Sequence, residues 1–205
     1  RNVAIFVDRV RELCKDRPGG EVSIWTDLNP HAWNRRSRQG PPSTYPSPSR
    51  DELRFQIWLA LIHGADGICF FPISFEPFVY AQIPARNEKE LAWNTQLISR
   101  MAPVLTAEAS PLAISVTSDR AGGVLDVTTR AAGDAHYVFL LNGEPKAQTV
   151  TLRVDGLGSQ WALVDAIEQK PVAGAAAGAY VEKLPGLALR IWELRPADAD
   201  TAYGE

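Results

Sequence analysis

Residues 48–75 read PSRDELRFQIWLALIHGADGICFFPISF, a helix signal followed directly by a strand signal. Ser49 and, three residues later, Glu52 form a capping box, which predicts a helix N-terminus. The helix predicted over 53–63 is apolar on nearly all sides, which indicates that most of its surface is buried. Residues 67–71 form a continuous apolar run, which is typical of a parallel strand covered by helices or enclosed in a barrel. This stretch therefore predicts one helix–strand unit of an α/β fold.

The flanking sequence extends this alternation of helices and strands. Apolar residues spaced by three and four predict a helix over 3–14, and a β-branched and aromatic run predicts a strand over 22–26. Long loops are predicted over 29–49 and 72–86, each after the carboxyl end of a strand, the edge that carries active sites in α/β folds. A third helix is expected after Asn87, which is a residue type that caps helices.

The first half of the chain thus contains only two predicted strands, both of the parallel type. Two strands do not form a stable sheet alone, because their edges and apolar faces stay unprotected. We therefore expect further βα units in the natural protein, preceding Arg1.

The pattern changes after about residue 106. Turn signals such as Asn142-Gly143 and Asp155-Gly156 separate seven short runs with strand character. The predicted strands are 112–117, 124–129, 135–142, 147–154, 160–165, 179–183 and 187–194. Their close spacing predicts an antiparallel sandwich or barrel.

Composition excludes several classes of protein. The 205 residues are 45% hydrophobic and 22% charged, with a formal net charge of -3, which indicates a globular chain and argues against nucleic-acid and acidic-membrane partners. No apolar run approaches the roughly 18 residues of a membrane-spanning helix. Two cysteines and three scattered histidines offer no metal-ligand spacing, and no Gly-rich phosphate loop is present, so no metal or cofactor is expected. The cysteines are interpreted as buried structural thiols. The composition indicates no particular cellular compartment.

The opening stretch resembles the seventh helix and eighth strand of (β/α)8-barrel glycoside hydrolases. These enzymes often show an Arg-rich helix start, then Ala-Leu, His-Gly-Ala, Gly-Ile and an aromatic strand end. Residues 22–30, VSIWTDLNP, resemble the seventh strand, and residues 87–105, NEKELAWNTQLISRMAPVL, resemble the eighth helix. The region 112–195, with HYVFLLNGEPKAQTVTLRV inside it, is similar to the small C-terminal β-domain that such barrels often carry.

The resemblance implies an α/β plus all-β chain: the last βα units of a TIM-type (β/α)8 barrel followed by a small antiparallel β-sandwich domain. In this interpretation, residues 1–106 are an incomplete barrel and residues 107–195 are the β-sandwich. Residues 196–205 are a flexible tail. The missing N-terminal barrel portion, in the same or a partner chain, is then an expected partner. His63 lies at the barrel end opposite the active site, so we expect it to hold its turn by hydrogen bonds.

The resemblance also implies where catalytic carboxyls lie. Retaining glycoside hydrolases use two of them, and the resemblance places one after strand four, outside this chain, and a Glu after strand seven. This sequence has Asp27 there, in WTDLNP. Aspartate is one methylene shorter, which displaces an attacking oxygen by about 1 Å, a costly error in a preorganised site. Three roles for Asp27 stay open: catalysis, hydrogen bonding to substrate, or an ordinary strand-end residue.

Candidate substrate-binding residues surround this position. Trp25 alternates onto the face of the aspartate and is either a sugar-stacking platform or a core residue. Asn29 either binds substrate or serves turn chemistry. Trp33 and Tyr45, in the long loop, are candidates for a sugar platform, unless the loop is a plain surface loop. Glu76 either binds a sugar hydroxyl or is solvated.

Three functions follow from this sequence. The first is a glycoside hydrolase whose catalytic barrel is incomplete in this chain, so that the chain alone is inactive. The second is a non-catalytic carbohydrate-binding or scaffolding protein with a degenerate barrel, which the Asp in place of Glu motivates. The third is a small α/β unit with a β-sandwich interaction module and no sugar chemistry.

Overall fold

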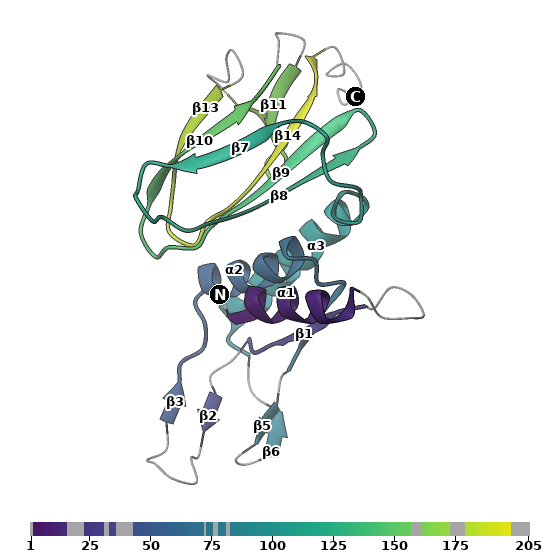
Figure 1. Cartoon of the computed structure of the whole chain (residues 1–205). Coiled ribbons are helices and arrows are strands. Elements are labelled where there is room, and N and C mark those ends of the chain that lie inside the picture. The colour runs from purple at the N-terminus through teal and green to yellow at the C-terminus, as the bar shows by residue number, and fades with distance from the viewer. Residues whose placement is uncertain are drawn as a thin grey trace, which may run out of the picture. The chain divides into compact units, whose positions relative to one another are not determined.

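The computed structural model describes residues 2–15, 23–30, 33–35, 43–71, 73–75, 78–80, 83–156, 161–172 and 179–197. The chain divides into two compact units, Arg1–Ile98 and Ser99–Glu205 (Figure 1). In the part of the chain that is described, no helix has both the length and the apolar character needed to span a membrane.

In the first unit, the described residues form three helices and six short strands. Its elements are α1 (Asn2–Cys14), β1 (Trp25–Leu28), β2 (Trp33–Arg35), β3 (Ser43–Tyr45), α2 (Arg50–Ile62), β4 (Gly67–Phe70), β5 (Ile73–Phe75), β6 (Phe78–Tyr80) and α3 (Ala85–Leu105), whose last residues belong to the second unit. Strands β1 and β4 pair in parallel, from Trp25 opposite Gly67 to Leu28 opposite Phe70. The predicted parallel pairing is thus confirmed, while β2–β3 and β5–β6 are antiparallel hairpins.

The start and end of α2 follow the sequence signals. The Ser49 hydroxyl accepts a hydrogen bond from the Glu52 amide at 3.2 Å, and the Glu52 carboxylate accepts one from the Ser49 amide at 2.7 Å. The capping box is therefore confirmed. Gly64 follows the helix with φ of 92°, a left-handed conformation that glycine adopts without strain. Seven of the thirteen helix residues are buried, which agrees with the nearly uniform apolar surface.

The turn after α2 is tied to α1 by polar side chains. His63 Nδ1 lies 2.9 Å from the Asp8 carboxylate, and the Arg11 guanidinium donates to the Gly64 carbonyl. The Asp66 carboxylate accepts a hydrogen bond from the Ile24 amide at 2.7 Å and so positions the chain that enters β1. The expectation that His63 holds this turn is confirmed.

Three boundaries in the first unit differ from the predictions. The strand predicted over 22–26 begins only at Trp25 and continues to Leu28, because its pairing with β4 spans those four positions. Each of the predicted long loops contains a short hairpin instead of irregular chain throughout. Asn87 is not a cap: it lies inside α3, is fully buried, and its side-chain amide donates to the Pro30 and Pro48 carbonyls at 2.7 and 3.2 Å.

The interpretation of the cysteines as buried thiols is wrong for Cys69, which is exposed. Cys69 lies opposite Asp27 in the parallel pair, on the face of β4 that turns away from the helices. An apolar strand sequence predicts burial on both faces, and this face stays open in the described part of the unit. Cys14 is half-buried.

The described residues of the second unit form two antiparallel sheets. Its strands are β7 (Ile114–Ser118), β8 (Leu125–Ala132), β9 (Ala135–Asn142), β10 (Gln148–Val154), β11 (Trp161–Asp165), β12 (Lys170–Pro171), β13 (Ala179–Leu184) and β14 (Leu189–Pro196). They form sheets of order β13-β10-β7 and β12-β11-β14-β9-β8 (Figure 1). One hydrophobic core takes residues from both sheets, among them Leu140, Leu152 and Trp192.

The seven strands predicted in this region are all present, with small shifts at their ends. The short strand β12 comes between β11 and β13 in the sequence and lies at the edge of its sheet. It was not predicted, because Lys170 and Pro171 carry no strand pattern. Pro196, which was assigned to the flexible tail, is the last residue of β14 and pairs with Trp161. Residues 198–205 lie outside the described residues.

A histidine in this unit gives its stability a pH dependence. Burial lowers the pKa of His136 below the ordinary 6.5, and its Nδ1 lies 2.9 Å from the Ser110 hydroxyl. The unfolded chain then binds the proton more readily than the folded chain, so stability falls as the pH drops through 6.5 toward the lower folded-state pKa. We expect His136→Asn to make urea-unfolding free energies fall less steeply between about pH 7 and pH 5. Parallel curves for the variant and the parent would contradict this linkage.

Candidate functional site

The face of β1 and β4 that turns away from the helices carries the predicted site residues. Side chains alternate along β1, so Trp25 and Asp27 are exposed, while Thr26 and Leu28 are buried on the other face. Their register partners on β4 are Gly67, which has no side chain, and Cys69, which is exposed on the same face as Asp27. The predicted alternation of Trp25 and Asp27 onto one face is therefore present.

Trp25 lies across the neighbouring strand. A Cβ atom added to Gly67 would come within 2.5 Å of the Trp25 ring, so only glycine leaves room for the indole at this position. The side chain is nonetheless 62% exposed. Within the described residues nothing covers this ring, and the indole offers an open aromatic surface of the kind that stacks on sugar C–H groups.

Asp27 lies next to the carboxyl end of β1 and is exposed, as is Asn29 just beyond the strand. Trp33 and Tyr45 are directly opposite each other in the β2–β3 hairpin, although sequence analysis had placed them in an irregular loop. Glu76 lies outside the described residues. The structure thus places three candidates on β1 or just beyond it, Trp25, Asp27 and Asn29, and two across the hairpin, Trp33 and Tyr45.

Within the residues that the structure describes, no group of three His, Cys, Asp or Glu side chains is arranged to hold a metal ion. The chemistry that this face offers is that of an exposed carboxylate beside an aromatic platform. A carboxylate can accept hydrogen bonds from sugar hydroxyls or act as a nucleophile or base at a sugar ring.

A second polar cluster, which sequence analysis missed, links α2 to α3. Glu90 is 2% exposed, and its carboxylate accepts hydrogen bonds from Arg54 Nε at 2.7 Å and Nη2 at 3.0 Å. Asn94 donates to the same carboxylate at 2.9 Å and accepts from the Trp58 indole N–H at 2.8 Å. The available signal was spacing: Glu90 lies on one helix face with Asn94, Leu97 and Met101, at intervals of three and four, and a charge on such a face requires a partner.

Comparisons with known proteins identify the fold and not the family. The chain matches no family model, and no curated protein matches it in sequence. Solved structures of glycoside hydrolases share its fold. The α-amylase of Geobacillus thermoleovorans, solved with acarbose, is 15% identical, with a TM-score of 0.57 over 94% of this chain and 43% of its own.

Two further structures give the same result. A β-L-arabinopyranosidase from Geobacillus stearothermophilus is 15% identical, with a TM-score of 0.53 over 99% of this chain and 43% of that one. A putative α-N-acetylgalactosaminidase from Bacillus halodurans is 13% identical, with a TM-score of 0.50 over 95% and 44%. The chain therefore has a mixed α/β fold that corresponds to part of these enzymes, and it spans less than half of their length.

The buried cluster gives a stability prediction. Glu90→Gln keeps the size of the side chain but removes the charge that Arg54 faces in a largely buried site, so we expect the complete protein to lose about 2 kcal/mol of unfolding free energy. Glu88→Gln is the matched control, because Glu88 is exposed on the same helix, and it should change the value by less than about 0.5 kcal/mol. Urea unfolding measures both. Equal effects would mean that the Glu90–Arg54 pair contributes nothing specific.

Proposed function

We propose that this chain is the C-terminal part of a glycoside hydrolase-like protein that acts on or binds carbohydrate. In this proposal β1 and β4 are the last two strands of a (β/α)8 barrel, residues 1–106 are its incomplete end, and residues 107–195 form a β-sandwich domain. The fold shared with glycoside hydrolases over nearly the whole chain supports it.

The observation that carries the proposal is the shared open face of Trp25 and Asp27 at the carboxyl end of a parallel strand pair. In barrel enzymes this end carries the active site. Asp27 is then the candidate catalytic carboxylate, as the nucleophile of the retaining mechanism or as a group that hydrogen bonds to the sugar. Trp25 and Asn29 bind substrate beside it, and Trp33, Tyr45 and Glu76 extend the sugar-binding surface from the hairpins.

The remaining barrel strands supply the rest of the site. Three large apolar side chains of α1 are more than half exposed: Ile5, Phe6 and Leu13. Such side chains gain about 1.5–3 kcal/mol each when they are buried, so further barrel elements packed on α1 would stabilise the unit. The second carboxylate lies in that portion, and the 205-residue chain alone therefore does not hydrolyse glycosides.

A non-catalytic function is the alternative, and the Asp at a position where Glu is usual favours it. One experiment separates the possibilities: a panel of glycans is titrated into the complete protein by calorimetry, and hydrolysis is followed in parallel. Binding with hydrolysis supports the enzyme, and binding without hydrolysis supports a carbohydrate-binding or scaffolding protein. If neither binding nor hydrolysis is observed, the third function remains, which is an interaction module without sugar chemistry.

A further inference from the structure

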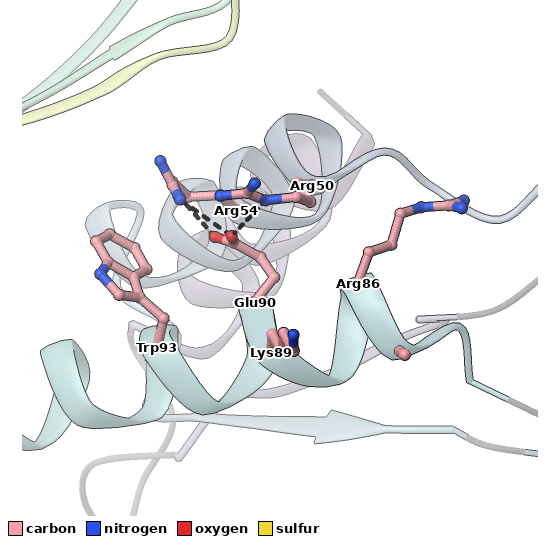
Figure 2. A pocket seen from close by; sticks show the side chains of 7 residues that line it. Arg50, Arg54, Arg86, Lys89, Glu90 and Trp93 are labelled. Carbon is pink, nitrogen blue, oxygen red and sulfur yellow. Dashed lines mark hydrogen bonds and ion pairs between the residues drawn. The ribbon is translucent and has the colours of Figure 1, made fainter.

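A pocket of about 470 Å³ lies between the first turns of α2 and α3 (Figure 2). Its lining comes entirely from these two helices: Arg50, Arg54, Ala85, Arg86, Lys89, Glu90 and Trp93. None of these residues belongs to the open face of β1 and β4, so the pocket is separate from the site of the proposed function.

The charge of this pocket is strongly unbalanced. Four of its seven lining residues are cationic, and only Glu90 is anionic. Its carboxylate is already engaged by Arg54, at 2.7 and 3.0 Å, and by Arg50 at 3.4 Å (Figure 2). Within the described residues, neither Arg86 nor Lys89 forms an ion pair. The Glu90 carboxylate thus forms ion pairs with two arginines, and two further cations line the same pocket.

One of these cations, Arg54, is held in place before any ligand binds. Glu90 is 2% exposed and fixes the Arg54 guanidinium, which also lies 4.1 Å from the centre of the Trp93 ring. Arg54 therefore has little side-chain freedom left to lose on binding, which lowers the entropic cost of binding a ligand beside it. Arg50 and Arg86 lie in the first turns of their helices, where the partial positive charge of the backbone adds to theirs.

We propose that this pocket binds a small organic oxyanion, a molecule that carries a carboxylate, sulfate or phosphate group. Clustered like charges repel each other, and an oxyanion offsets that repulsion while it accepts charge-assisted hydrogen bonds from Arg and Lys. The volume lies in the range of small-molecule pockets, which run from about 300 to 1,000 Å³, and exceeds the space that one inorganic ion fills. Arg86 and Lys89 contact the anionic group, and Arg50 lies opposite them.

The test is calorimetric titration of the complete protein, at about 20 mM salt so that screening is weak. The probes are a hexuronate, a hexose phosphate and inorganic phosphate, which separate a carboxylated sugar, a phosphorylated sugar and free phosphate as sources of the oxyanion. At least one probe should bind at one site per chain with a millimolar or lower Kd. The double variant Arg86→Gln/Lys89→Gln should weaken that binding by about tenfold or more, because it removes two charge-assisted hydrogen bonds.

Arg9→Gln is the matched control, since Arg9 is an exposed arginine on α1 outside the pocket. It should leave the Kd unchanged to within about twofold. Thermal melting of each variant shows that the fold is intact, and the loss of two repelling cations should not lower the melting temperature. Absence of binding for all three probes at about 10 mM overturns the proposal. An equal loss of affinity in Arg9→Gln also overturns it, because the effect would then come from net charge alone.

Discussion

If the complete protein is the glycoside hydrolase proposed above, replacing Asp27 with Asn is expected to lower its kcat/KM for a glycoside by about three orders of magnitude or more. The carboxylate is exposed at the carboxyl end of β1, and the amide of Asn is neither a nucleophile nor a base. The effect should fall mainly on kcat, since an amide still forms hydrogen bonds with sugar hydroxyls. Steady-state kinetics with a chromogenic glycoside measure it.

Two further variants are needed to interpret the effect of Asp27→Asn on kcat/KM. Asp134→Asn is the matched control, because Asp134 is an exposed aspartate in the turn between β8 and β9, and it should leave kcat/KM unchanged. Asp27→Glu tests geometry: if the site needs the longer carboxylate that the resemblance to barrel glycoside hydrolases implies, this variant keeps more activity than Asp27→Asn. Hydrolysis by Asp27→Asn at the parent rate would remove Asp27 from the mechanism.

Residues 1–105 expressed alone are expected to show no cooperative unfolding transition. Among the described residues of this fragment, the only parallel sheet is a pair of four-residue strands, and a two-stranded pair is marginal without further strands. Four large apolar side chains on α1 and β1 are also exposed: Ile5, Phe6, Leu13 and Trp25. Urea titration followed by circular dichroism and tryptophan fluorescence measures the transition.

The control is the fragment of residues 107–205, which holds two sheets around one hydrophobic core. We expect this fragment to unfold in a single sharp transition, as small domains with their own core do. A sharp two-state transition of residues 1–105 would instead show that this unit is stable without further strands, and the proposal of an incomplete barrel would fail.

Local signals in the sequence predicted much of this fold. The capping box of Ser49 and Glu52 begins α2 as expected, because this signal acts within a few residues. The strands of the second unit were found from turn residues and alternation for the same reason. Trp25 and Asp27 were placed on one face, since strand periodicity determines that from sequence alone.

Features that depend on distant parts of the chain were not predicted. Asn87 was expected to cap a helix, but its side chain donates to carbonyls at Pro30 and Pro48, far away in sequence. The exposure of Cys69 depends on what covers one face of β4, which its apolar sequence does not reveal. The pairing of Glu90 with Arg54 joins residues of two helices that are 36 positions apart in the sequence. Tertiary contacts of this kind override local propensity.

The most direct test of the account is glycan binding by the complete protein, compared with its Trp25→Ala variant. The indole is 62% exposed beside Asp27, so its loss should remove a stacking surface without opening a cavity in the core. The account predicts that one class of glycan in a calorimetric panel binds and that Trp25→Ala weakens this binding by about tenfold or more. If no glycan binds, or if the variant binds as tightly as the parent, the open face of β1 and β4 is not a carbohydrate site.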